Sequence, residues 1–133
     1  MLDPRHCAVL GEGVMALGIT TSKIGEVIVV HLSGVIYFGQ ESALLRLRVK
    51  DLLDNSGQIV LDLAGVTHID SGGLGTLVGL FASARKVGGD IKLAALCSHP
   101  KEVLQITKLV TVFEIFQRAE DAAASFKRTA TAI

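Results

Sequence analysis

The chain of 133 residues has room for one domain, because a single hydrophobic core usually spans roughly 100 to 200 residues. Half of the residues are hydrophobic and only 20% are charged, a composition that excludes a chain without a folded core. The 13 basic and 13 acidic residues cancel, and the small basic groups at 46–50 and 127–128 lack the aromatic partners of a strand-binding surface. We therefore expect no direct contact with nucleic acid.

The two ends of the chain differ from its body. Residues 1–13 show no hydrophobic periodicity, so we expect a disordered leader there, one domain over 14–128 and a flexible tail over 129–133. No apolar stretch in the leader has the length that secretion requires. The longest uncharged window, 71–84, has 14 residues and four glycines, fewer than the roughly 20 apolar residues that cross a bilayer. These features predict a protein without membrane insertion, and two cysteines that could make at most one bridge favour reduced thiols in a cytoplasm.

Hydrophobic periodicity divides the body into short elements. An approximate alternation over 15–24 and a β-branched run over 26–32 predict two strands that form an antiparallel pair. After this pair, amphipathic helices alternate with short apolar strands and with a loop over 64–70. The expected helices cover 40–54, 71–87, a segment that begins at 98, and 119–127, and the expected strands cover 58–63, 91–96 and 111–116. Such alternation predicts an α/β fold, with a mixed, mostly parallel β-sheet packed with about four α-helices.

Four glycines lie within the first nine residues of the second expected helix, and each costs about 0.8 to 1 kcal/mol relative to alanine inside a helix. We expect Gly75 and Gly79 to let another backbone pack closely against one face. We expect Gly72 and Gly73 to clear the space around Ser71. Ser71 itself fits both an N-cap, whose side-chain oxygen accepts a bond from a helix N–H, and an accessible modification site.

Residues 68–75 read His-Ile-Asp-Ser-Gly-Gly-Leu-Gly, at the junction between a strand region and a helix. This run resembles the Asp-Ser-Ser/Thr-Gly-Leu-Gly signature of STAS domains, a family of bacterial anti-sigma factor antagonists and sulfate-transporter tails. Leu-Ser-Gly at 32–34 and Lys-Val-Gly-Gly at 86–89 match the family in the same order. The resemblance covers about 17–127 and implies a single STAS-like domain.

The resemblance also implies a function. In the antagonist branch of the family, the serine after the aspartate is phosphorylated by the cognate anti-sigma factor, a serine kinase of the GHKL type. The matching residue is Ser71. The unphosphorylated protein is expected to bind the kinase and free a sigma factor, and phosphorylation is expected to break the complex; a homodimer is a further option. The residues expected to contact the partner are Asp70, Ser71, Gly72, Gly73, Gly75, Thr76 and Tyr37.

Two positions depart from the family pattern. Gly72 replaces a small hydroxyl residue after the serine, which keeps the small size. Tyr37 stands where related antagonists usually have an aspartate, three residues after the matching Gly34, and this favours a divergent partner. The alternative is therefore a STAS module that serves another assembly, such as a stressosome-like scaffold or a lipid ABC transporter.

The sequence gives little support to a catalytic or metal-binding role for the same residues. A hydrolase elbow needs glycine two positions before Ser71, where Ile69 stands, and a lone His68 is more typical of a solvated side chain. A phospho-aspartate receiver needs an acidic Mg²⁺ cluster beside Asp62 or Asp70, and the ends of the first strands supply none. The sequence has no P-loop, and its four histidines and two cysteines lack metal-ligand spacing. We therefore expect no enzymatic activity, no cofactor and no metal.

Overall fold

The computed structural model describes residues 17–131, with side chains described as far as Phe126. The leader expected over 1–13 and the last two residues of the expected tail lie outside this range. The elements in chain order are β1 (Gly18–Ile24), β2 (Val27–Ile36), α1 (Gln40–Leu53), β3 (Gln58–Ile69), α2 (Ser71–Lys86), β4 (Asp90–Ala94), α3 (Ser98–Ile106), the 3₁₀ helix η1 (Leu109–Thr111), β5 (Ile115–Phe116) and α4 (Ala119–Thr131).

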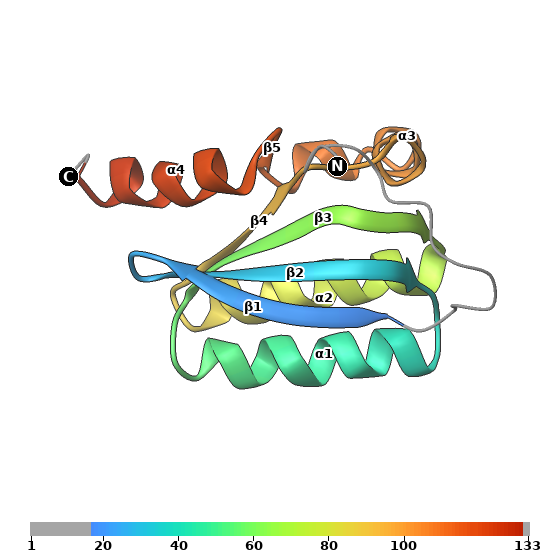
Figure 1. Cartoon of the computed structure of the whole chain (residues 1–133), viewed down its shortest axis with the longest axis horizontal. Helices are drawn as coiled ribbons and strands as arrows, with labels where there is room; N and C mark the ends of the chain where they lie inside the picture. The colour runs from blue at the N-terminus through green and yellow to red at the C-terminus, as the bar shows by residue number, and fades with distance from the viewer. Residues whose placement is uncertain (1–16, 132–133) are drawn as a thin grey trace, which may run out of the picture.

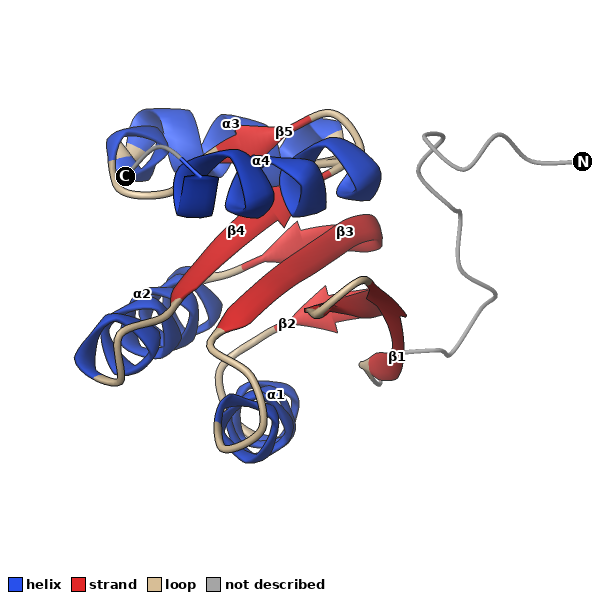
Figure 2. Ribbon diagram, turned by 90° about the vertical axis from the view of Figure 1, so that its left-hand side faces the viewer, coloured by secondary structure: helices blue, strands red, loops and turns tan. Residues whose placement is uncertain are grey.

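The strands form one mixed sheet in the order β1-β2-β3-β4-β5, with β1 antiparallel to β2 and the other neighbours parallel. Figure 1 and Figure 2 show α1 and α2 on one face of this sheet and α3 and α4 on the other. The expected α/β class, with a mostly parallel sheet and four α-helices, is confirmed. The connections β2–α1–β3 and β3–α2–β4 place their helices on the same face, as right-handed crossovers between successive parallel strands do.

The long pairing of β2 with β3 corrects two expected boundaries. β2 continues past Gly34 to Ile36, and β3 occupies most of the loop expected over 64–70. Two shifts of register interrupt the parallel pairing, and glycine is needed where the backbones approach closely. A Cβ atom at Gly65 would lie 2.9 Å from the carbonyl oxygen of Leu32. Glycines that suggest a loop in the sequence therefore permit an irregular strand.

The C-terminal third also differs from expectation in its boundaries. The strand expected over 111–116 is reduced to Ile115–Phe116, because η1 occupies Leu109–Thr111. The last helix continues to Thr131, beyond the expected end at 127 and into the segment expected to be a tail.

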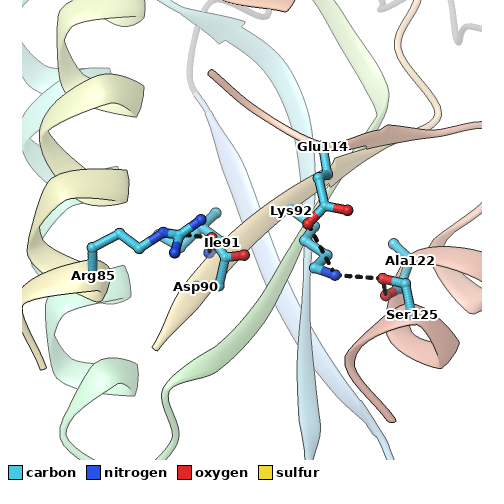
Figure 3. A network of polar contacts seen from close by, with 7 residues as sticks. All are labelled: Arg85, Asp90, Ile91, Lys92, Glu114, Ala122 and Ser125. Carbon is cyan, nitrogen blue, oxygen red and sulfur yellow. Dashed lines mark hydrogen bonds and ion pairs between the residues drawn. The ribbon is translucent and has the colours of Figure 1, made fainter. Parts of the chain in front are cut away.

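A buried lysine attaches α4 to the sheet. Lys92 on β4 is 2% exposed, and its Nζ donates a hydrogen bond to the Ser125 hydroxyl at 2.6 Å. The same ammonium lies 3.2 Å from a carboxylate oxygen of Glu114 and 4.4 Å from the ring centre of Phe126. Figure 3 shows Lys92 between Glu114 and Ser125, with the Ser125 hydroxyl bonded in turn to the Ala122 carbonyl. The free-energy cost of burying this charge is offset by the ion pair with Glu114, the hydrogen bond to Ser125 and the aromatic face of Phe126.

The four glycines of α2 divide into two pairs with opposite environments. A Cβ atom at Gly73 would collide with the carbonyl oxygen of Ile36, and one at Gly72 would lie 2.9 Å from the Cα of Phe38. A Cβ atom at Gly75 or Gly79 would meet no atom within 4 Å. The expected close contact at Gly75 and Gly79 is therefore wrong, because these two face outward and the first pair packs against the end of β2.

This division predicts opposite effects of adding one methyl group. Gly73→Ala should destabilise the fold by about 1 to 3 kcal/mol or more, because the methyl group meets backbone that cannot move aside. Gly75→Ala is the matched control, and it should be neutral or stabilising by up to about 1 kcal/mol, because it raises helix propensity at an open position. Urea denaturation of both variants measures the difference. Equal midpoints would contradict the packing assigned to Gly73.

The lysine network predicts a second effect on stability. Ser125→Ala removes the hydroxyl that accepts from Lys92, and should cost about 1 to 3 kcal/mol because the buried ammonium keeps its ion pair with Glu114 but loses its hydrogen bond to α4. Ala124→Ser adds a hydroxyl at the exposed neighbouring position and should change stability by less than about 0.5 kcal/mol. Thermal and urea unfolding of both variants provide the test. A Ser125→Ala variant as stable as the wild type would show that the hydrogen bond adds nothing.

Candidate functional site

The candidate site lies where β2 and β3 end side by side. Ile36 and Ile69, the last residues of the two strands, are partners in the parallel register. The chain then enters the loop 37–39 before α1, and it passes through Asp70 into α2. Helix N-termini and loops therefore gather at the carboxyl edge of the sheet, where α/β proteins usually present their binding groups.

Asp70 holds the two connections together. Its Oδ1 accepts the Gly73 N–H at 2.8 Å, and both carboxylate oxygens lie 3.1 Å from the Phe38 amide nitrogen. Its own N–H donates to the Ile36 carbonyl at 3.3 Å. Asp70 is thus the N-cap of α2, and the expectation of an N-cap at Ser71 is wrong. An extended backbone at Asp70 lets its carboxylate reach forward to the helix N–H.

Ser71 is the first residue of α2, and its side chain is exposed. Within the range 17–131, its hydroxyl makes no hydrogen bond. The first turn of α2 contains no acidic residue, and the N-cap carboxylate of Asp70 accepts one of its N–H groups, that of Gly73. The structure therefore presents a free hydroxyl at a position that favours an added anion.

The remaining expected contact residues do not all reach the surface. Thr76 is 3% exposed, and its hydroxyl donates to the Gly72 carbonyl at 3.1 Å and accepts from Arg46 at 3.3 Å. Gly73 is buried as well. Thr76 therefore joins α1 to α2, and its side chain is buried between them. Tyr37 is half-buried, and its carbonyl accepts a hydrogen bond from Ser42 near the start of α1.

Phe38 is a surface residue beside Ser71 that the sequence motif does not include. Its side chain is 81% exposed, although its N–H is held by Asp70 and its Cβ lies directly over Gly72. The sequence signal that could have identified Phe38 is an aromatic residue in a short connection. This connection lies between the end of β2 at Ile36 and Gly39, which has a positive φ.

His68 does not act on Ser71. Its Nδ1 lies 3.1 Å from the Thr67 hydroxyl, and its ring lies 4.5 Å from that of His99 at the start of α3. Among the residues that the structure describes, no three His, Cys, Asp or Glu side chains gather as metal ligands would. No helix in the same range is long and apolar enough to cross a bilayer. Among the described residues, the contacts of His68 are therefore with Thr67 and His99 and not with Ser71.

Two curated relatives match most of the fold. A candidate anti-sigma factor antagonist from Bordetella bronchiseptica, BtrV, is 28% identical over 109 residues, which cover 82% of this chain and 94% of the relative. The anti-sigma-B factor antagonist of Bacillus subtilis is 32% identical over 76 residues, which cover 57% of this chain and 70% of the relative.

Solved structures share the architecture at lower identity. A candidate anti-sigma factor antagonist from Thermotoga maritima superposes with a TM-score of 0.73 at 23% identity, covering 80% of this chain and 92% of that one. The Bacillus cell fate determinant SpoIIAA in its phosphorylated form superposes with a TM-score of 0.65 at 17% identity, covering 82% and 99%.

The model of the STAS domain family matches residues 18–122, which include every strand and the Asp70–Ser71 junction. That range also contains the register between β2 and β3 that brings this junction beside the loop 37–39. The chain therefore belongs to the STAS domain family, among relatives named as anti-sigma factor antagonists.

Proposed function

We propose that this protein is an anti-sigma factor antagonist that works in the cytoplasm. It binds an anti-sigma factor serine kinase of the GHKL type, which frees a sigma factor, and phosphorylation of Ser71 ends the complex. The observation that carries the proposal is the free, exposed hydroxyl of Ser71 at the start of α2. The family membership and the names of the relatives support the same function.

The kinase contact would form around the end of β2 and the start of α2. Ser71, Gly72 and Gly75 supply backbone and a hydroxyl, while the half-buried Tyr37 and the exposed Phe38 supply aromatic surface. Asp70 holds this surface in place through hydrogen bonds to Phe38 and Gly73. Tyr37 stands where related antagonists usually have an aspartate. This favours a kinase whose contact surface is less basic than that of the kinases that bind those antagonists.

A phosphoryl group on Ser71 would change contact more than folding. It would add about −1.5 to −2 charges at a helix N-terminus, where free N–H groups and the helix dipole stabilise an anion. The first turn of α2 has no acidic side chain that would oppose it. The same charge would stand beside the Asp70 carboxylate and next to Phe38, so a docked partner would meet bulk and negative charge.

The site of phosphorylation is testable by mass. With ATP and the cognate kinase, we expect one phosphoryl group per chain on Ser71, because its hydroxyl is exposed and makes no internal hydrogen bond. Intact mass and peptide mapping locate it. Ser71→Ala should remain unmodified, and Thr76 should stay unmodified in both proteins because it is 3% exposed. A phosphoryl group on another residue of the wild type, with Ser71 unmodified, would refute the assignment.

A change of charge at residue 71 should alter binding of the kinase and leave the fold intact. Ser71→Ala should bind the kinase and resist release by ATP, whereas Ser71→Asp should bind more weakly and phosphorylated wild type most weakly of all. The fold should persist throughout, since a carboxylate at a helix N-terminus contributes up to about 1 kcal/mol of stability. Calorimetry measures binding, and circular dichroism checks the fold.

The binding comparison also decides between classes of STAS module. If phosphorylated wild type binds the kinase as tightly as the unmodified protein, the antagonist proposal fails. A role in a stressosome-like scaffold or a lipid ABC transporter would then replace it.

A further inference from the structure

A row of polar side chains crosses three strands on the α4 side of the sheet, away from Ser71. His31 on β2 and Asp62 on β3 are direct partners in the parallel register. On the edge strand β1, Thr20 pairs with His31, and Ser22 is therefore its diagonal neighbour on the same face. Alternate residues of a strand share a face, so Ser22, His31 and Asp62 stand in one line across the sheet.

The three side chains form a directed chain of hydrogen bonds. His31 Nδ1 lies 2.8 Å from Asp62 Oδ2, and Ser22 Oγ lies 2.8 Å from His31 Nε2. A carboxylate only accepts, so Nδ1 carries the imidazole proton, and in the neutral ring Nε2 accepts from the Ser22 hydroxyl. The other oxygen of Asp62 accepts the Ala64 N–H at 3.0 Å, which fixes the carboxylate. This is the connectivity of a serine nucleophile, a general base and an orienting acid.

The row opens into a pocket of about 800 Å³. Ile24, Val29 and Ala95 supply apolar walls, and Arg118 and Glu120 at the rim lie 3.6 Å apart and largely cancel each other's charge. A pocket of this kind favours a small uncharged ligand with an apolar part.

The first turn of α4 borders the same pocket. Ala119 and Glu120, the first two residues of the helix, line it, and the N–H groups of a first helical turn have no partner within the helix. Such groups stabilise the oxyanion that forms when a carbonyl is attacked.

Backbone strain marks the same place. Ala95, which follows β4 and lines the pocket, has a φ of 59°, a left-handed conformation that non-glycine residues seldom adopt. Its N–H donates to the Phe116 carbonyl at 2.9 Å, which holds this conformation. Residues kept in such conformations gather at functional sites.

We propose that Ser22, His31 and Asp62 form an acyl-transfer site that hydrolyses small, uncharged carboxylic esters. Ser22 Oγ attacks the ester carbonyl carbon while its proton passes to His31 Nε2. The tetrahedral oxyanion collapses, the bond to the alkoxy oxygen breaks, and that oxygen leaves as an alcohol with the proton from Nε2. Water then attacks the acyl-Ser22 ester, again losing a proton to His31, and the carboxylic acid departs as Ser22 recovers its proton.

Asp62 is a positioning residue in this scheme, because it touches His31 and not the ester. It keeps the proton on Nδ1, so that Nε2 is free to accept from Ser22. Asp62→Asn should therefore lower kcat with little change in KM, whereas a purely structural role would leave kcat intact in a folded variant.

The full-length protein can be tested with two probes, 4-nitrophenyl acetate and a fluorophosphonate that labels activated serines. Wild type should hydrolyse the ester and take up one fluorophosphonate adduct on Ser22. Ser22→Ala and His31→Gln should lose about 10²-fold or more of the rate, in line with the loss of a nucleophile or general base. Intact mass and peptide mapping locate the adduct, and circular dichroism confirms that each variant is folded.

Two controls separate this activity from general reactivity and from the proposed role of Ser71. Ser71→Ala should retain full hydrolysis and labelling, because Ser71 is an exposed serine without a histidine partner. Thr20→Val changes a neighbouring hydroxyl on β1 that lies outside the chain of hydrogen bonds, and should also retain them. Wild-type hydrolysis no faster than Ser22→Ala, or an absence of label on Ser22, would overturn the proposal and leave the row as a tie between strands.

Discussion

The carboxylate of Asp70 is the interaction on which the Ser71 surface depends. It joins the loop after β2 to the first turn of α2, through the N–H groups of Phe38 and Gly73. Hydrogen bonds to an ionised acceptor are stronger than neutral ones, so one side chain can hold two connections that are far apart in the sequence. The exposure of Ser71 and the placement of Phe38 both follow from this contact, and a phosphoryl group on Ser71 would act directly beside it.

The glycines of α2 extend the same surface. Gly72 and Gly73 let the helix begin against the end of β2, where any side chain would collide with backbone. Gly75 and Gly79 follow Ser71 at intervals of four residues, so all three lie on one face of the helix. This face carries no bulk, and a partner can approach the backbone there. All four glycines lower the helix propensity of α2. Packing requires glycine at Gly72 and Gly73, whereas Gly75 and Gly79 leave one face of the helix open.

The two faces of the sheet have different chemistry. The face beneath α1 and α2 is lined by aliphatic side chains, whereas the α4 face includes Lys92, His31 and Asp62. Each of these polar groups has a partner, and no buried side-chain nitrogen or oxygen in the described residues lacks one. Lys92 is closed in by Ser125 and Glu114, but the His31 row remains open to a pocket.

The sequence by itself determined the class of fold, and its resemblance to the STAS family placed the candidate phosphorylation site at Ser71. Hydrophobic periodicity and β-branching are local signals, and they predicted the alternation of strands and helices and the start of α2 at Ser71. The motif around Asp70 was read from adjacent residues as well. These features depend on neighbours within one turn of helix or a few residues of strand.

The tertiary structure decided which residues meet. The extension of β3 to Ile69, the cap by Asp70, the exposure of Phe38 and the opposite roles of the glycine pairs all depend on how β2 and β3 pair. Ser22 and His31 lie on different strands, so they become neighbours only when strand order and register are known, whereas His68 and Ser71 are close in the sequence and yet share no hydrogen bond among the described residues. A polar residue within an apolar strand shows that a partner is needed, but the register alone determines which one it finds.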